Sequence, residues 1–306
     1  MFASSHAKQS FPRDFLSQPS FEKMVGENMV GVSLKAQHYQ TILEQLPPLG
    51  WFEVHCENYM GAGGAPHYYL GRIAENYPIS FHGVGMSLGS CQRLDKDHLF
   101  KLRELVDRYC PFLVSEHLAW CGTEQRYLND LLPMPYTAES LDVLVRHVDE
   151  MQTTLRRQIL IENPSSYLEY RGQDYDEAAF LVELARRSGC KILLDINNIY
   201  VSSCNHGWDA LAYLRSIPAD IVGEIHLAGH HVRQWRGQEI RIDDHGSNVC
   251  EAVWALFENA VGMVGIKPTL VEWDSNVPSL LTLLQEAGRA SLIMDKISDR
   301  VGCHGG

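Results

Sequence analysis

The sequence predicts a single α/β domain in which eight parallel strands alternate with helices and close into a (β/α)8 TIM barrel. Eight short apolar runs rich in β-branched residues recur along the chain, separated by longer segments. The length of 306 residues suits one such barrel. No proline- or glycine-rich linker divides the chain. We therefore expect one domain over residues 1–306, with its core at roughly 23–300 and short loose ends.

Each of the eight runs is five or six residues long and nearly continuous in its apolar character. Such runs are typical of parallel strands, which are covered on both faces. The predicted strands are Met29–Ser33, Trp51–His55, Pro78–His82, Pro111–Glu116, Gln158–Glu162, Lys191–Asp195, Ile221–His226 and Pro268–Glu272.

The segments between the runs have helical periodicity. In one segment, a single helical face would carry Tyr39, Ile42, Leu43 and Leu46. In another, a single face would carry Leu141, Leu144, Val145 and Val148. Each crossover is long enough for a helix, so eight strand–helix units favour a closed barrel. An open doubly wound sheet is the main alternative. It fits less well, because no Gly-x-Gly-x-x-Gly follows the first run and metal-ligand residue types end seven different runs.

Composition limits the functional classes. The hydrophobic share is 45% and the mean hydropathy is −0.18. No stretch reaches the roughly 18 apolar residues of a membrane span, and the first residues lack the apolar segment of a secretory signal. We expect a cytoplasmic protein that does not span a membrane.

Charge and cysteine usage add two further expectations. With 26 Lys and Arg against 38 Asp and Glu, the net charge of −12 argues against a nucleic-acid substrate. The eight cysteines include no Cys-x-x-Cys pair, so we expect free thiols.

Imidazole and carboxylate side chains end seven of the eight predicted strands. In a closed barrel these strand ends meet at one mouth, where active sites lie. The segment Arg241–His245 (RIDDH), before the last strand, adds Asp243 and His245. Carboxylates gathered in one place repel each other unless cations neutralise them, so the pattern predicts metal binding.

The number of these side chains exceeds what one ion needs, so we expect two or three metal ions. Ligands of imidazole and carboxylate without thiolate suit iron, manganese or zinc. Within this set, Glu116 is expected as a bridging or terminal ligand and Asp243 or a near neighbour as the proton acceptor. Asp243 and Glu116 are the predicted catalytic residues. The predicted ligands are His55, His82, Glu116, Asn163, Asp195, His226, Asp243, His245 and Glu272.

Several weaker candidates surround this set. Asn198 is expected in a loop above the mouth, as a ligand or a hydrogen-bond donor. His206 is expected in the same region, either near the site or on the surface. His117 is expected to orient the glutamate before it, and His230 and His231 to lie behind the ligands or in solvent.

Eight motifs in order make the sequence similar to a known family: EVHCENYM, SFHGVGMSLGS, VSEHLAW, IENPSSYL, LLDINNIYVSSCNHG, EIHLAGHH, RIDDHG and VEWDSNVPS. The chain resembles the multinuclear non-haem iron-dependent oxidative enzymes, formerly a domain of unknown function. That family includes the enzymes of methanobactin, thiaglutamate and chryseobasin biosynthesis.

The resemblance implies a TIM barrel with two or three iron ions, whose site zinc or manganese could also fill. It implies O₂ as co-substrate, oxidation of cysteine in a ribosomally made precursor peptide, and a partner protein that presents this peptide. The ligand order is also similar to that of endonuclease IV and sugar isomerase barrels, except that Asn198 stands where those have histidine. A zinc or manganese hydrolase or isomerase is the alternative, and a metal-free, peptide-binding barrel is a third hypothesis.

Overall fold

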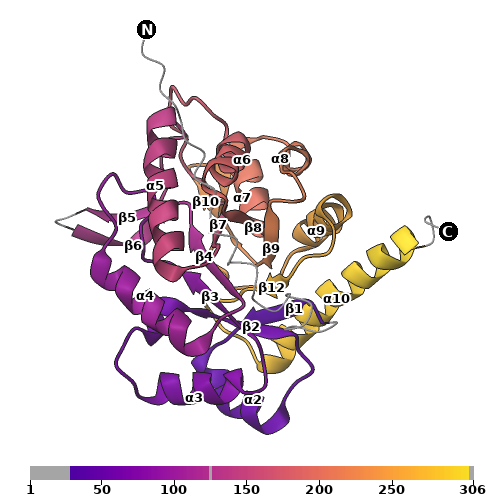
Figure 1. Ribbon diagram of the computed structural model, residues 1–306. Coiled ribbons are helices and arrows are strands. Elements are labelled where there is room, and N and C mark those ends of the chain that lie inside the picture. The colour runs from indigo at the N-terminus through magenta and orange to yellow at the C-terminus, as the bar shows by residue number, and fades with distance from the viewer. Residues whose placement is uncertain (1–27, 124–125, 303–306) are drawn as a thin grey trace.

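Eight parallel strands form a closed barrel in the computed structural model, which describes residues 28–123 and 126–302 (Figure 1). The barrel strands are β1 (Val30–Ser33), β2 (Trp51–His55), β3 (Ile79–Gly83), β4 (Leu113–His117), β7 (Leu160–Glu162), β8 (Lys191–Asp195), β9 (Val222–Leu227) and β12 (Thr269–Val271). They pair in the order β1-β12-β9-β8-β7-β4-β3-β2. The predicted fold class and all eight predicted strands are thus confirmed.

Helices cover the outside of the barrel between successive strands (Figure 1). They are η2 (Ala36–His38), α2 (Tyr39–Gln45), η3 (Cys56–Tyr59), α3 (Ala65–Ala74), α4 (Lys96–Tyr109), α5 (Ala138–Leu155), α6 (Glu177–Ser188), α7 (Ile196–His206), α8 (Ala210–Ser216), α9 (Glu251–Val264) and α10 (Leu280–Gly302). Local sequence explains where several of them begin. The side chains of Asp95, Thr137 and Asp176 each accept a main-chain N–H in the first turn of α4, α5 and α6.

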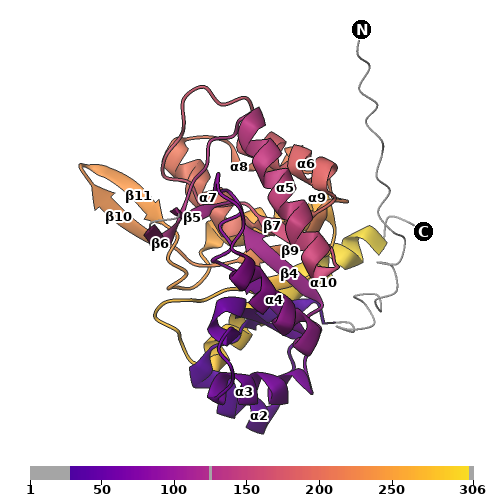
Figure 2. The same cartoon turned by 60° about the vertical axis from the view of Figure 1, so that its left-hand side comes forward.

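Two antiparallel hairpins, which the sequence analysis did not predict, extend the connections that follow β4 and β9. They are β5–β6 (Trp120–Thr123 with Arg126–Leu132) and β10–β11 (His231–Trp235 with Gln238–Ile242). Because both follow the carboxyl ends of barrel strands, both leave the barrel at its mouth. Figure 2 shows β10–β11 projecting as a two-stranded arm.

The barrel interior changes from apolar to polar along the strands. Near their amino ends, Trp51, Phe112 and Leu270 form a small buried cluster of their own. A Cβ on Gly31 would come within 2.4 Å of the Trp51 ring, so this position needs glycine. One step towards the mouth, Ser80 donates a hydrogen bond to Glu53 (3.2 Å), and both are buried.

Three local expectations are wrong. Asn198 and His206 lie in α7 and not in a loop, since Asp195 caps that helix by accepting the N–H of Asn198 (2.6 Å). Leu46 ends α2 with a φ of 45° and is 50% exposed. The expected tail from Val301 instead continues α10 to Gly302, while the other expected tail, up to Glu22, lies outside the described residues.

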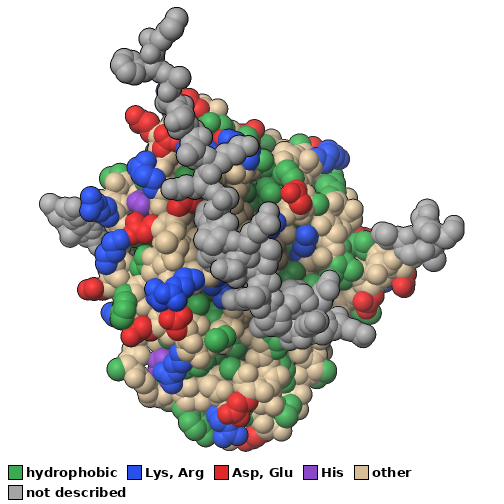
Figure 3. Space-filling model, in the orientation of Figure 1, with side chains coloured by type: hydrophobic (Ala, Val, Ile, Leu, Met, Phe, Trp, Pro, Cys, Tyr) green, Lys and Arg blue, Asp and Glu red, His purple; other side chains and the backbone are tan. Residues whose placement is uncertain are grey.

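The surface and the thiols give little sign of a second function. On the face in Figure 3, acidic and basic side chains are interspersed. In the described part of the chain, no helix is long and apolar enough to cross a membrane. Free thiols are carried by Cys56, Cys91, Cys110, Cys190, Cys204 and Cys250.

Replacing the fully buried Phe180 of α6 with alanine should lower the free energy of unfolding by about 3–5 kcal/mol, because it leaves a cavity in the core. The ring of Phe180 packs 4.9 Å from that of Tyr136. The matched control is Phe100→Ala on α4, where the ring is 59% exposed and we expect a change of less than about 0.5 kcal/mol. Guanidinium unfolding with chelator present in all samples measures both, and equal losses would contradict the prediction.

Candidate metal centre

Strand alternation places histidines and carboxylates inside the barrel at its mouth. On β9, Glu224 and His226 share the inward side, as Glu53 and His55 do on β2. His226 Nε2 lies 3.5 Å from Glu53 Oε1, although β9 and β2 are not neighbours in the barrel. Contacts between non-neighbouring strands require both side chains to point into the interior.

The first group consists of His82, His117 and Glu162. Glu162 Oε2 lies 3.1 Å from His82 Nε2 and 3.3 Å from His117 Nε2, and the two nitrogens are 3.4 Å apart. Ligand atoms about 2.1 Å from a shared ion would lie about 3.0–3.4 Å apart at octahedral and tetrahedral angles. The three atoms therefore have the spacing of ligands to one ion.

Hydrogen bonds to the other ring nitrogens orient both histidines of this group. His117 Nδ1 donates to the carbonyl oxygen of Gly83 (2.9 Å), and His82 Nδ1 is bonded to Ser115 Oγ (2.7 Å). A histidine whose Nδ1 carries the proton keeps a lone pair on Nε2 for a metal ion. His117 therefore presents Nε2 as a potential ligand.

Four further groups have ligand atoms within 4.8 Å of one another in the described part of the chain. They are Glu53, His226 and Glu272; Glu162, Asp195 and His226; His55, Glu272 and Asp274; and Asp195, His245 and Glu272. Glu272 belongs to three of the five groups, and Glu162, Asp195 and His226 belong to two each. The groups thus form one connected cluster.

Five buried carboxylates lie in or next to this cluster. Glu53, Glu162, Asp195, Glu224 and Glu272 are each at most 3% exposed. Among the described residues, no Lys or Arg forms an ion pair with any of these five carboxylates. The ion-pair partners of Glu53, Glu162, Glu224 and Glu272 are histidines.

These carboxylates and histidines change one another's pKa values. Burial alone would lower the pKa of His82, but the hydrogen bond and the charge of Glu162 raise it to about 10. Burial alone would raise the pKa of Glu162, but His117 and His82 lower it to about 2. Burial, followed by the charge of Glu53, raises the pKa of Glu224 to about 7. A field that binds protons so strongly also favours cations.

Two buried oxygen atoms at the mouth, Asp195 Oδ2 and Asn198 Oδ1, have neither a hydrogen bond nor an ion pair with any described residue. The other polar atom of each side chain is hydrogen-bonded. Asp195 Oδ1 accepts the main-chain N–H of Asn198. Asn198 Nδ2 donates to Glu162 Oε1 (3.2 Å) and to the carbonyl of Asn163 (3.0 Å). Buried oxygens left without a donor are costly unless a cation satisfies them. Together with the ligand spacing, they fit a metal centre.

Six of the nine predicted ligands fall in these groups: His55, His82, Asp195, His226, His245 and Glu272. The other three lie beside them. Glu116 accepts main-chain N–H groups from His117 (2.9 Å) and Met86 (3.3 Å). Asn163 forms two hydrogen bonds with the main chain of Asp195: Nδ2 donates to the carbonyl and Oδ1 accepts the N–H. These bonds join the ends of β7 and β8.

Asp243 is the third residue beside the groups. Its Oδ1 accepts Asn197 Nδ2 (2.7 Å) and lies 2.7 Å from His245 Nε2. Its main-chain N–H donates to Tyr167 Oη (2.9 Å). Among the described residues, none donates a hydrogen bond to Oδ2, so this oxygen is available to accept a proton.

Glu53, His117, Glu162 and Asp274 lie in these groups but are absent from the predicted ligand set. Strand parity could have found His117 and Glu162. Ser115 and His117 share the inward side of β4, so Glu116 between them points the other way. His230, expected behind the ligands, bonds to Asn197 Oδ1 (2.8 Å), and His231 begins the exposed strand β10.

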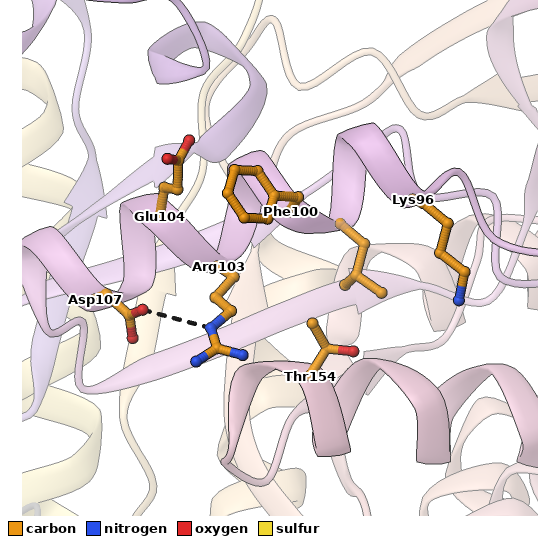
Figure 4. Close-up of a pocket in the computed structure, with 7 residues that line it drawn as sticks. Lys96, Phe100, Arg103, Glu104, Asp107 and Thr154 are labelled. Carbon is orange, nitrogen blue, oxygen red and sulfur yellow. Dashed lines mark hydrogen bonds and ion pairs between the residues drawn. The ribbon is translucent and has the colours of Figure 1, made fainter.

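Two cavities outside the barrel contain none of these groups. One, of about 440 Å³, is a groove between α4 and α5, where Arg103 pairs with Asp107 at 3.4 Å (Figure 4). The other, of about 410 Å³, is lined in part by α6, α8 and His206. His206 Nε2 donates there to the carbonyl of Ser166 (3.0 Å), so His206 does not approach the mouth.

Comparison with known proteins identifies close relatives of the whole barrel. Residues 29–295 match the family "RiPP precursor modification enzyme MbnB/TglH/ChrH", where RiPP denotes a ribosomally synthesised, modified peptide. UPF0276 protein RB0508 of Rhizobium meliloti (strain 1021) is 49% identical over 283 residues, which are 92% of each chain. UPF0276 protein VP3015 of Vibrio parahaemolyticus is 45% identical over 270 residues, which are 88% of this chain and 94% of the relative.

Solved structures with low sequence identity share the fold. An L-ribulose 3-epimerase matches with a TM-score of 0.60 at 13% identity, over 90% of this chain and 98% of the other. Endonuclease IV from Thermus thermophilus matches with a TM-score of 0.55 at 13% identity, over 89% of this chain and 99% of the other. At this identity the likeness extends to the barrel alone.

Proposed function

Because the chain belongs to the RiPP precursor modification enzyme family MbnB/TglH/ChrH, we propose that it is an iron-dependent oxidase. In this proposal it modifies cysteine residues of a ribosomally made precursor peptide with O₂. The observation that carries the proposal is the connected cluster of five ligand groups at the mouth. Its shared carboxylates suit two or three ions better than one.

The proposal gives these residues the following roles. His82, His117 and Glu162 would hold one ion, and the groups that share Asp195, His226 and Glu272 would hold the others. Asn163 and Asn198 keep the ligand strands in place through their amide groups. Glu116 fixes the main chain beside His117.

Iron supplies redox chemistry with O₂ that a redox-inactive ion such as zinc cannot supply. The chain's residues then bind the peptide cysteine at the mouth, limit the access of water and move protons. Asp243 is the proposed proton acceptor. Its Oδ1 is held by Asn197 and His245, which leaves Oδ2 for the proton of the substrate thiol.

The proposal includes a second protein that presents the precursor peptide. The most direct test expresses the chain together with the short cysteine-containing reading frames beside its gene, and then measures the mass of each peptide and the metal content of the protein. We expect an altered peptide mass and two or three equivalents of metal per chain. Unchanged peptides together with less than about one equivalent of any transition metal would overturn the proposal.

Single substitutions should rank three residues by how much each contributes to metal affinity. Glu162→Gln should lower metal affinity by more than about a hundredfold, Glu116→Gln by at most about 10–100-fold, and His206→Ala not at all, since a ligand contributes more than the residues that support it. Glutamine keeps the shape of each side chain and removes its charge. Elemental analysis after dialysis measures the ranking. Equal losses for Glu116→Gln and Glu162→Gln would place Glu116 among the ligands.

A further inference from the structure

The hairpin β10–β11 is placed directly between residues of the metal centre. β10 begins at His231, shortly after His226 of β9, and β11 ends at Ile242, next to Asp243. The arm projects from the barrel mouth (Figure 2). Any molecule that lies along this hairpin is therefore led to the mouth.

One edge of the hairpin is fastened to the barrel. Asn205 of α7 accepts the main-chain N–H of Arg241 and donates to its carbonyl, both at 2.9 Å. The Arg241 guanidinium lies 5.6 Å above the ring of Tyr200, also on α7. Strand β11 is thus held on its outer side, which fixes the direction of the arm.

The other edge, along β10, is open. All five residues His231–Trp235 are exposed. Among the described residues, only β11 pairs with their main-chain groups. An exposed strand edge presents free N–H and C=O groups to which an extended peptide can add as a further strand.

The side chains on this edge favour an acidic partner with apolar residues. Arg233 forms no hydrogen bond or ion pair with any described residue, and the Arg236 guanidinium lies 5.5 Å above the Trp235 ring. Trp235 and Val232 are 57% and 44% exposed. This basic and apolar arm stands out on a chain whose net charge is −12.

We propose that the open edge of β10 binds an extended acidic segment of the precursor peptide as an additional strand, and so brings the adjoining cysteine to the mouth. The identity of the bound molecule as precursor rests on the proposed function. The substrate itself fits better than a separate folded protein, because both ends of the hairpin connect to the metal centre.

The test uses fluorescence anisotropy at low salt with a labelled peptide of alternating Glu and Val that ends in Gly-Cys. Two matched probes replace Glu with Lys, or methylate alternate main-chain nitrogens so that they cannot pair. We expect each change to weaken binding at least about tenfold, because charge and main-chain pairing both contribute. Arg233→Glu should weaken binding of the acidic probe by a similar factor.

The control variant Arg146→Glu reverses the charge of another exposed arginine, on the outer helix α5, and should bind the acidic probe as the unmodified protein does. Circular dichroism and metal content should not differ between the two variants. The proposal is overturned if the acidic probe fails to bind the unmodified protein, or if Arg233→Glu binds it equally well. Equal binding of all three probes would show that neither the charge nor the main-chain pairing contributes, and would also overturn it. Because binding needs no turnover, its outcome is separate from that of the oxidase proposal.

Discussion

Protein reconstituted with Fe(II) under anaerobic conditions should change the mass of its precursor peptide when O₂ is admitted, whereas protein reconstituted with Zn(II) should not. The ligand cluster has imidazole and carboxylate donors, which accept either metal, so the difference comes from the metal's redox chemistry. We expect a difference in product of at least about a hundredfold. Peptide mass spectrometry after a fixed exposure to O₂ measures it.

The controls for this experiment address metal exchange. Divalent affinity generally favours zinc over iron, so zinc retained from expression would mask the activity and must be removed before loading. Iron-loaded protein kept anaerobic is the second control. Equal modification by zinc-loaded protein would point to the hydrolase or isomerase alternative, and no change with iron for any cysteine-containing precursor would refute the oxidase.

Replacing Glu272 with alanine should reduce bound metal from two or three equivalents to fewer than about one per chain. Glu272 belongs to three of the five ligand groups, where its carboxylate lies 3.3 Å from both His226 and His245. Its removal affects more than one ion, and we therefore expect a larger loss than the about 10–100-fold typical of a supporting residue. The metal content, measured by elemental analysis, and the yield of modified peptide should fall together.

The matched control is Glu251→Ala on α9, a carboxylate that is 82% exposed and, among the described residues, paired only with Arg289. It should retain full metal content. If Glu272→Ala also retained two or more equivalents with unchanged activity, the shared-ligand arrangement would be wrong. A thermal unfolding scan of both variants distinguishes metal loss from general misfolding.

The sequence predicts the barrel well because its strands are buried on both faces. Runs such as Lys191–Asp195 are almost continuously apolar, whereas in the helical segments around them apolar residues recur every three or four positions. The hairpin β10–β11 has no buried face, so no apolar alternation marks it. Its strands are defined by pairing with each other and by contacts of Asn205, and these depend on three-dimensional proximity.

The predicted ligands that lie in the candidate groups, such as His82 and His226, are single candidates at their strand ends, whereas Glu116 and Asn163 each have a second candidate beside them. Glu116 was chosen over His117, and Asn163 over Glu162, although in each pair only one side chain faces the interior. Whether a side chain at the mouth is free to bind a metal ion also depends on its hydrogen-bond partners. Nothing local in the sequence indicates that both amide atoms of Asn163 pair with the main chain of Asp195.

The residues of the proposed metal centre are buried on barrel strands, whereas those of the hairpin β10–β11 are largely exposed, and this difference has an evolutionary consequence. A substitution at Glu162 or His226 removes a buried group that pairs with several others, so we expect these positions to tolerate little change. Exposed positions such as Arg233 and Trp235 carry no such constraint. If the arm binds the precursor as proposed, substitutions in it would change which peptide is bound and would leave the residues of the metal centre unchanged, so one barrel could serve many peptides.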